Sequence, residues 1–354
     1  MVREYGYEYD AILDDSLWAK DAKKFAEDKL FGAYCLRSGR DALKAIAREY
    51  PPCIVYLPAL ICETVISPFL MWGHRISFYR LNADYSIKME DVVISPTEHH
   101  VLFLYLDYFG NQAITEDKLI ALKQKHTNIV FIEDRTHCFF SKKWSSFCPD
   151  YVVVSLRKWI AIPDGALLWG NVSNRFSFQS LFSEKRLEAQ CKRHYYLTSG
   201  DVRVKNDFRK TFNDLSSILD SESTPCAMSL YSFHKALAMD WEFIENRRKE
   251  NADVLSSILT TSKVISLIQK KTGLSDLYVP FMVPNRDEIQ RKLSTKGIFN
   301  TIIWPLSSEQ KSTCRIAKIT EENMLAAPCD QRYECKDMEY IGNEIVRMAE
   351  DVNQ

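Results

Sequence analysis

Short apolar runs alternate with amphipathic stretches over the first half of the chain, and this alternation is the strongest constraint on its fold. The apolar runs predict strands at residues 53–57, 75–81, 101–106, 128–134, 151–155 and 165–170. The helical periodicity predicts helices at residues 14–30, 40–49, 61–71 and 115–126. Strands and helices that alternate through short connections are typical of a mostly parallel sheet with helices on both faces, so an α/β fold is expected.

The pattern changes after residue 170, where the predicted helices become longer. They cover residues 174–197, 207–219 and 228–259, and we interpret the charge run at 245–250 as a solvent-exposed helix face. Strands at 277–283 and 298–303 then flank a helix at 286–296, and a terminal helix covers 337–352. We therefore expect a large α/β domain over residues 1–235 and a small C-terminal α+β domain over residues 236–354.

Composition excludes several classes of function. The 354 residues carry a formal net charge of −1, so no overall attraction to nucleic acid or to an anionic membrane is expected. No stretch approaches the roughly 20 apolar residues of a membrane-spanning helix, and the N-terminus lacks the apolar region of a secretory signal, which favours a cytoplasmic protein. The 10 cysteines form no CxxC pair, so we expect reduced thiols and no metal site.

Polar side chains follow two of the predicted strands directly. Lys158 comes just after the apolar run at 151–154, with Ser155 three residues before it, and Asp134 ends the run at 128–134. Because ligands of parallel α/β sheets collect at the carboxyl ends of the strands, we expect these side chains to share a cleft. Ser38 and Gly39 precede a predicted helix, where they could seat a phosphate or, equally, serve only as a helix N-cap.

These residue types match the needs of pyridoxal phosphate. The cofactor requires a lysine that forms a Schiff base with its aldehyde and a carboxylate that keeps the pyridine nitrogen protonated, which makes the ring an electron sink. It also requires a seat for its phosphate. The sequence offers one candidate for each requirement. Lys158 is the candidate lysine, Asp134 the candidate carboxylate, and the Ser38–Gly39 turn with Ser155 the candidate phosphate seat.

Taken together, the segments resemble fold type I pyridoxal phosphate enzymes and, within them, the DegT/DnrJ/StrS sugar aminotransferases. The resemblance spans most of the chain, at residues 38–43, 56–73, 108–111, 133–137, 150–165, 296–305 and 328–333. It implies pyridoxal 5′-phosphate as cofactor, and it implies a role for each of a set of residues. These are Lys158 as Schiff-base lysine and proton shuttle, Asp134 on the pyridine nitrogen, His137 beside the ring hydroxyl, and Ser38, Gly39, Arg40, Ser155 and Arg157 around the phosphate.

The chain departs from the family pattern at two positions. Only two residues separate Ser155 from Lys158, a shorter spacing than the commoner family loop and one found in other fold type I transaminases. The aromatic residue that usually stacks on the cofactor ring aligns near Cys62, so Tyr108, Tyr56 or another side chain would take its place.

The resemblance implies a transaminase that acts on a keto-sugar nucleotide with a glutamate-like amino donor, for polysaccharide or glycoside biosynthesis. It also implies a homodimer, with candidates for shared residues between 193 and 212. Two alternatives keep the cofactor: a lyase or decarboxylase, and a regulatory protein that only binds it. A third, a serine acyl-enzyme built on Ser155-x-x-Lys158 and the Lys271-Thr272-Gly273 triplet, is disfavoured because the middle motif of such enzymes is missing.

Overall fold

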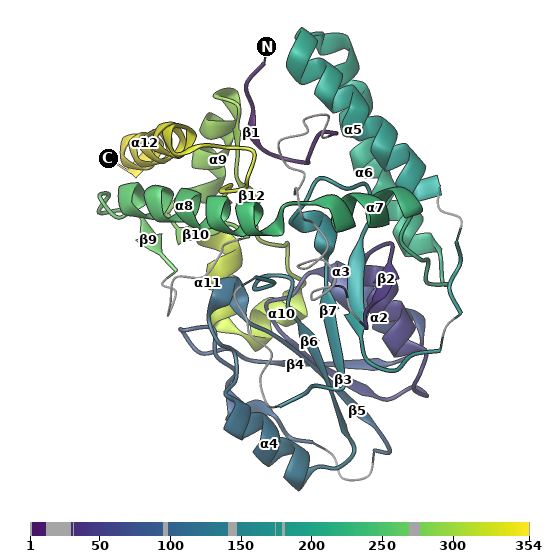
Figure 1. Cartoon of the computed structure of the whole chain (residues 1–354). Helices are drawn as coiled ribbons and strands as arrows, with labels where there is room; N and C mark the ends of the chain where they lie inside the picture. The colour runs from purple at the N-terminus through teal and green to yellow at the C-terminus, as the bar shows by residue number, and fades with distance from the viewer. Residues whose placement is uncertain are drawn as a thin grey trace.

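A computed structural model of the chain describes residues 2–11, 30, 32–94, 98–140, 147–173, 175–178, 181–268 and 277–353. Its centre is a seven-stranded sheet (Figure 1). From one edge to the other the strands are β2 (Tyr34–Leu36), β8 (Ala166–Trp169), β7 (Tyr151–Val154), β6 (Ile129–Asp134), β5 (Val101–Leu106), β3 (Ile54–Pro58) and β4 (Arg75–Tyr79).

The sheet is mostly parallel, as the sequence predicts. Strands β4, β3, β5, β6 and β7 pair in parallel, and only β8 runs antiparallel to its neighbours β7 and β2. Every residue of β5 is buried, because a central parallel strand is covered on both faces and is therefore apolar throughout.

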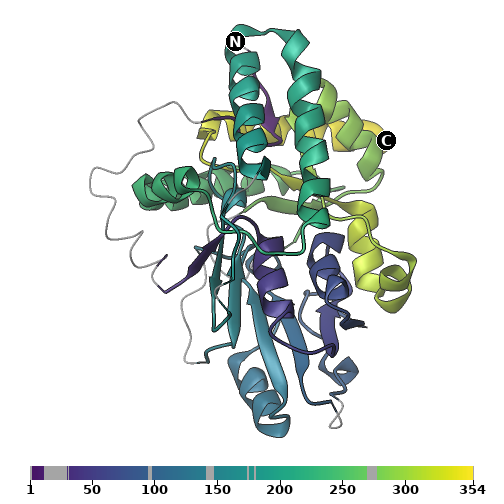
Figure 2. The ribbon, with the colours of Figure 1, turned by 90° about the vertical axis from the view of Figure 1, so that its right-hand side faces the viewer.

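Helices connect the strands of this sheet and extend beyond it. They are α2 (Gly39–Ala47), α3 (Glu63–Met71), α4 (Glu116–Lys125), α5 (Leu181–Ser199), α6 (Lys205–Ser221) and α7 (Leu230–Ala238). Helices α5 and α6 pack against each other as a pair that stands above the sheet (Figure 2). Their shared core contains Phe182, Tyr196, Phe208 and Leu215.

The C-terminal residues form a second, smaller sheet with its own apolar core. The four strands are antiparallel, in the order β12 (Thr301–Ile302), β13 (Met324–Ala327), β10 (Val279–Met282) and β9 (Ser266–Leu267). The accompanying helices are α8 (Trp241–Leu259), α9 (Arg286–Thr295), α10 (Ser308–Thr313), α11 (Arg315–Asn323) and α12 (Cys335–Asn353). The N-terminal strand β1 (Tyr5–Gly6) pairs with β11 (Ile298–Phe299), so the start of the chain lies against these C-terminal elements.

Three predicted elements are wrong in their extent. The helix expected at 228–259 is two helices, because Ser229 caps α7 and Asp240 caps α8, where its side chain accepts a bond from the Phe243 N–H at 2.9 Å. The helix expected from residue 174 begins at Leu181, since Ser177 makes a β-bridge to Cys226 instead. The strand expected at 298–303 is divided between β11 and β12, which belong to different sheets.

Some predictions fall outside what the structure describes. The helix expected at 14–30 and the triplet 271–273 lie outside the described residues, apart from Leu30. The boundary expected at residue 235 stays a prediction. The structure also contains β2, β13, α10 and α11, which the periodicity does not indicate because each is short or lies in an irregular context.

The order of the strands determines where a ligand can enter the large sheet. From β3 the chain crosses to β4 on one side, whereas from β5 it proceeds to β6 and β7 on the other side. Strands β3 and β5 are neighbours, so the connections diverge between their carboxyl ends. A crevice at such a divergence is the usual ligand site of an open α/β sheet.

Candidate active site

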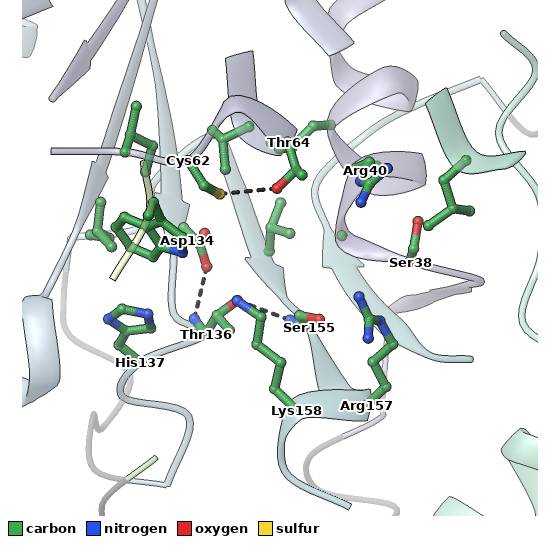
Figure 3. A pocket seen from close by; sticks show the side chains of 18 residues that line it. Ser38, Arg40, Cys62, Thr64, Asp134, Thr136, His137, Ser155, Arg157 and Lys158 are labelled. Carbon is green, nitrogen blue, oxygen red and sulfur yellow. Dashed lines mark hydrogen bonds between the residues drawn. The ribbon is translucent and has the colours of Figure 1, made fainter. Parts of the chain in front are cut away.

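A cavity lies at this carboxyl edge, and nearly all of the predicted site residues line it (Figure 3). Leu106 at the end of β5 and Ile61 after β3 contribute apolar wall, as the divergence of the connections leads one to expect. The predicted residues that line it are Ser38, Gly39, Arg40, Cys62, Asp134, His137, Ser155, Arg157 and Lys158.

The lysine sits on a single turn that follows β7. Ser155 follows the last residue of the strand, and Leu156–Lys158 form a short 3-10 turn. The turn is attached to the neighbouring strand end through Thr136, whose hydroxyl accepts a bond from the Ser155 N–H at 3.0 Å. The Thr136 carbonyl accepts another from the Trp159 indole N–H at 2.9 Å. In Figure 3 the Lys158 side chain extends towards Thr136 and Asp134.

Asp134 provides a partly buried carboxylate near the lysine. Its Oδ1 accepts a bond from the Thr136 N–H at 2.8 Å, which orients the carboxylate where β6 ends. Burial raises the pKa of Asp134, while the Thr136 bond and the positive charge of Lys158 act in the opposite direction. When it is ionised, this carboxylate can stabilise the protonated form of a basic ligand nitrogen in the cavity.

His137 is buried between two aromatic rings. Its ring stacks on Phe109 at 4.9 Å between centroids and on Trp304 at 5.7 Å, each with an interplanar angle of 26°. Burial, with a smaller effect of the Lys158 charge, lowers the pKa of His137 from 6.5 to about 3, so the imidazole is neutral at physiological pH. Its Nδ1 is buried and has no hydrogen-bond partner among the described residues, so it can bond to a ligand in the cavity.

The predicted phosphate seat is the start of α2. Ser38 is the N-cap: its hydroxyl accepts from the Asp41 N–H at 3.2 Å and donates to the Asp41 carboxylate at 2.5 Å. Capping therefore occupies the Ser38 hydroxyl, and the free groups at this end are backbone N–H groups, which attract anions. A methyl group on Gly39 would lie 3.8 Å from Ser155 Cβ, so the helix start and the lysine turn face each other closely.

Two arginines give this end of the cavity its positive charge. Arg40 bonds to helix α6, at the Asp220 carboxylate at 2.6 Å and the Ser216 carbonyl at 3.0 Å. Arg157 is different, because its Nε is buried without a hydrogen-bond partner among the described residues. Burial and the charge of Arg186 lower the pKa of Arg157 to about 10, so its guanidinium still carries a charge at neutral pH. An anion beside it would be stabilised.

An ion pair that was not predicted from the sequence anchors this helix. Arg37 donates to both Asp41 oxygens, at 3.0 and 2.8 Å, and both side chains are fully buried. Asp41 also accepts from the Cys226 N–H at 3.2 Å. The spacing of an arginine four residues before an aspartate at a helix start is the signal that could have indicated the pair.

Tyr108 and Cys62 differ from each other in their relation to the cavity. Tyr108 is not among the lining residues; its hydroxyl donates to the Leu60 carbonyl, and its ring packs edge-on against His137 at 6.4 Å. Cys62 does line the cavity, with its Sγ 3.0 Å from Thr64 Oγ1. Thr64, Thr136 and Trp304 also line it, and the sequence analysis assigned no role to them.

The residues present fit pyridoxal phosphate. The cavity offers a lysine and a carboxylate from adjacent strand ends, and a cationic end built from Arg157 and the start of α2. The two buried polar atoms without partners, His137 Nδ1 and Arg157 Nε, lie on residues that the resemblance assigns to the ring hydroxyl and the phosphate. Among the described residues no cluster of His, Cys, Asp or Glu is able to hold a metal ion, and no helix is long and apolar enough to cross a membrane.

Among the comparisons with known proteins, only the comparison with solved structures finds similar proteins. No protein-family model matches the sequence, and no curated protein matches it. Among solved structures, the Helicobacter pylori aminotransferase PseC, involved in the biosynthesis of pseudoaminic acid, is similar with a TM-score of 0.66 at 14% identity, over 99% of this chain and 100% of that one. A DegT/DnrJ/EryC1/StrS aminotransferase from Brucella abortus has a TM-score of 0.61 at 13% identity, over 96% and 91% of the two chains.

A third similar structure is that of a dehydratase, whereas the two structures above are aminotransferases. The Escherichia coli GDP-4-keto-6-deoxy-D-mannose-3-dehydratase, with bound hydrated pyridoxal phosphate, has a TM-score of 0.63 at 13% identity, over 97% of this chain and 100% of that one. The chain thus has the fold of fold type I pyridoxal phosphate enzymes, as predicted. At these identities the likeness concerns the fold, and the activity is argued from the site.

The low pKa of His137 predicts a specific dependence of stability on pH. The unfolded chain binds a proton on this residue near pH 6.5, whereas the folded chain binds it only near pH 3. Folding is therefore disfavoured as the pH falls through this window. Relative to a His137→Gln variant, the wild-type free energy of unfolding should fall by about 1.4 kcal/mol per pH unit below 6.5.

Urea unfolding of the cofactor-free protein at several pH values between 7 and 4 measures this difference. His99→Gln, at an exposed histidine, is the control and should follow the wild type. Parallel pH profiles for wild type and His137→Gln would show that His137 is not held neutral by burial.

Proposed function

We propose that the protein is a pyridoxal phosphate-dependent aminotransferase. The observation that carries the proposal is the convergence of Lys158, Asp134, His137 and Arg157 on one cavity at the carboxyl edge of the sheet. Pyridoxal phosphate supplies the electron sink for breaking a bond at the carbon that carries the amino group. The protein's contribution is to bind, orient and exchange protons.

Each residue has a distinct part in that contribution. Lys158 would hold the cofactor through its amine, and the same amine would move the proton, as base and afterwards as acid. The Asp134 carboxylate would keep the pyridine nitrogen protonated, and the neutral imidazole of His137 would bind the ring hydroxyl. The buried side chains of Leu106 and Ile61, which line the cavity, limit the access of water to these groups.

The phosphate is assigned to Arg157 and the backbone at the start of α2. Supporting this is the buried Nε of Arg157, which has no hydrogen-bond partner among the residues with described positions. The Ser38 hydroxyl caps the helix, so we assign its contact to the backbone only. Ser155 lines the same end, and its hydroxyl is a further candidate ligand.

Replacing Arg157 separates phosphate binding from ring binding. In Arg157→Met we expect the dissociation constant for pyridoxal phosphate to rise about 10- to 100-fold, because charged hydrogen bonds contribute about 1.5–3 kcal/mol. Pyridoxal, which lacks the phosphate, should bind with nearly unchanged affinity. Quenching of tryptophan fluorescence measures both constants, with exposed Arg203→Met as control. An equal loss of affinity for pyridoxal phosphate and for pyridoxal would contradict a contact between Arg157 and the phosphate.

The acceptor is proposed to be a keto-sugar linked to a nucleotide, with a glutamate-like donor, in polysaccharide or glycoside biosynthesis. Support comes from similar structures such as PseC, which takes part in making pseudoaminic acid. Incubation with glutamate and a panel of keto-sugar nucleotides, followed by mass spectrometry of the products, tests the substrate class.

Lys158 is the residue on which this proposal depends. The wild type should show a visible chromophore that borohydride traps on Lys158, and glutamate should convert its absorbance to that of the pyridoxamine form. Lys158→Ala should lose both signals, because no other lysine lines the cavity among the described residues. Lys192→Ala, at a partly exposed lysine, should keep them. A trapped chromophore on any other lysine would contradict the assignment.

Elimination or decarboxylation on the same cofactor is the second candidate. It is favoured by the similarity to the Escherichia coli dehydratase. Fold alone does not choose between these reactions, since the bond aligned with the ring decides it. Conversion by glutamate to the pyridoxamine form would support transamination. Stable retention of the cofactor without any conversion would support a binding or regulatory role instead.

We also propose that the protein acts as a homodimer in the cytoplasm. Phe178, Leu181 and Leu230 expose 86, 55 and 75% of their surface, and the bridge between Ser177 and Cys226 brings their segments together. Arg193 and Lys205, within the stretch expected to be shared, both pair with Glu4 of the same chain. Sedimentation at several concentrations tests the proposal, and a monomer throughout would contradict it.

A further inference from the structure

The turn that carries Lys158 is held at a second point, the carbonyl oxygen of Trp159. This oxygen accepts three hydrogen bonds: from the Tyr9 hydroxyl at 3.1 Å, from Arg248 Nη2 at 3.1 Å and from Gln331 Nε2 at 2.9 Å. A carbonyl oxygen has two lone pairs, so three donors saturate it. The position of the oxygen is therefore determined from three directions.

The three donors come from distant parts of the chain. Tyr9 belongs to the N-terminal segment, Arg248 to α8, and Gln331 to the segment between β13 and α12. None of them belongs to the large sheet that carries Lys158. The contact thus connects the lysine turn to the elements around the smaller sheet.

The donors also hold one another. Arg248 Nε donates to the Gln331 side-chain oxygen at 2.9 Å, and Arg248 Nη2 donates to the Tyr9 hydroxyl at 2.6 Å. The Arg248 guanidinium lies 4.9 Å from the centre of the Trp159 ring, within the range of a cation–π contact. All three side chains are at least nine-tenths buried, so water does not readily replace a bond that is lost.

The opposite side of the turn is attached to the large sheet. There Thr136 accepts bonds from the Ser155 N–H and from the Trp159 indole. Lys158 thus lies between two fixed points, with the Ser155 N–H on one side and the indole N–H and carbonyl of Trp159 on the other. A shift of the Trp159 carbonyl would move the backbone of Trp159 and, through it, that of the preceding residue, Lys158.

We infer that Tyr9, Arg248 and Gln331 are positioning residues that set the location of the Lys158 amine through the Trp159 carbonyl. The inference rests on the proposed function for its catalytic consequence, whereas the positioning itself is a property of the cofactor-free chain. Tyr9 and Arg248 also line a second cavity, together with Arg157 and Lys158. The effect of the three positioning residues depends on holding one backbone oxygen.

Two variants each remove one donor while keeping the shape of the cluster. Tyr9→Phe keeps the ring, which packs 4.3 Å from the Arg332 guanidinium, and loses only the hydroxyl. Gln331→Glu keeps an oxygen for Arg248 and loses the N–H group directed at Trp159. Tyr5→Phe is the matched control, because Tyr5 is a buried tyrosine of the same segment whose hydroxyl bonds to Asp337 at 3.4 Å.

The first measurement needs no cofactor. Limited acetylation of the apo protein, with mass spectrometry, gives the labelling rate of Lys158 relative to other lysines. We expect about a threefold or greater change in Tyr9→Phe and Gln331→Glu and none in Tyr5→Phe, because a freed turn changes the exposure of the amine. Labelling identical to the wild type in both variants would overturn the inference. If Gln331→Glu fails to fold, Tyr9→Phe decides alone.

The second measurement uses the cofactor. In a single turnover with glutamate, the two variants should be about tenfold or more slower, because a small displacement of a catalytic group is costly. The dissociation constant for pyridoxal phosphate should change by a smaller factor than the rate, since Asp134, His137 and the start of α2 line the cavity from outside this turn. Equal loss of rate and affinity would indicate general disruption and overturn the inference. A wild type without a lysine chromophore would overturn the proposed function while the labelling still tests the positioning.

Discussion

The site depends on Thr136, a residue that connects two strand ends through three hydrogen bonds. Its N–H orients the Asp134 carboxylate, its hydroxyl holds the Ser155 N–H, and its carbonyl holds the Trp159 indole. Two of these bonds involve the turn that carries Lys158. One buried residue therefore holds both the Asp134 carboxylate and the turn that carries the Lys158 amine, which keeps their relative position constant. Because Thr136 is buried, water does not readily compete for its three hydrogen bonds.

Charge in the cavity follows from burial. His137 is neutral because an imidazolium would lose its hydration there, and Asp134 stays near a lysine that compensates its charge. At the other end, the buried pair of Arg37 and Asp41 fixes the first turn of α2, and Arg157 remains a cation beside it. The result is a cavity with an anion-binding end and an end that can exchange protons, separated by only a few side chains.

Much of this could be predicted from particular residues. The apolar runs before Asp134 and Lys158 indicated parallel strands, and parallel strands bring the two side chains to one edge. The resemblance over 133–137 and 150–165 added His137 and the lysine turn. The break at Asp240 was missed because a cap in a charged, helix-forming stretch has no periodic signal, and Trp304 and Gln331 were given no role because they approach the site only through folding.

The sequence by itself determined the α/β class, the edge of the sheet where the cavity lies, and most of the side chains that line it. Those properties depend on strand and helix periodicity and on residues next to strand ends, which are local in the chain. Only the tertiary structure decided that the Ser38 hydroxyl caps a helix, that Tyr108 stands outside the cavity, and that the Trp159 carbonyl receives donors from three distant segments. The hydrogen bonds to the Trp159 carbonyl join residues up to 172 positions apart, and they form only when the elements around the smaller sheet pack against the lysine turn.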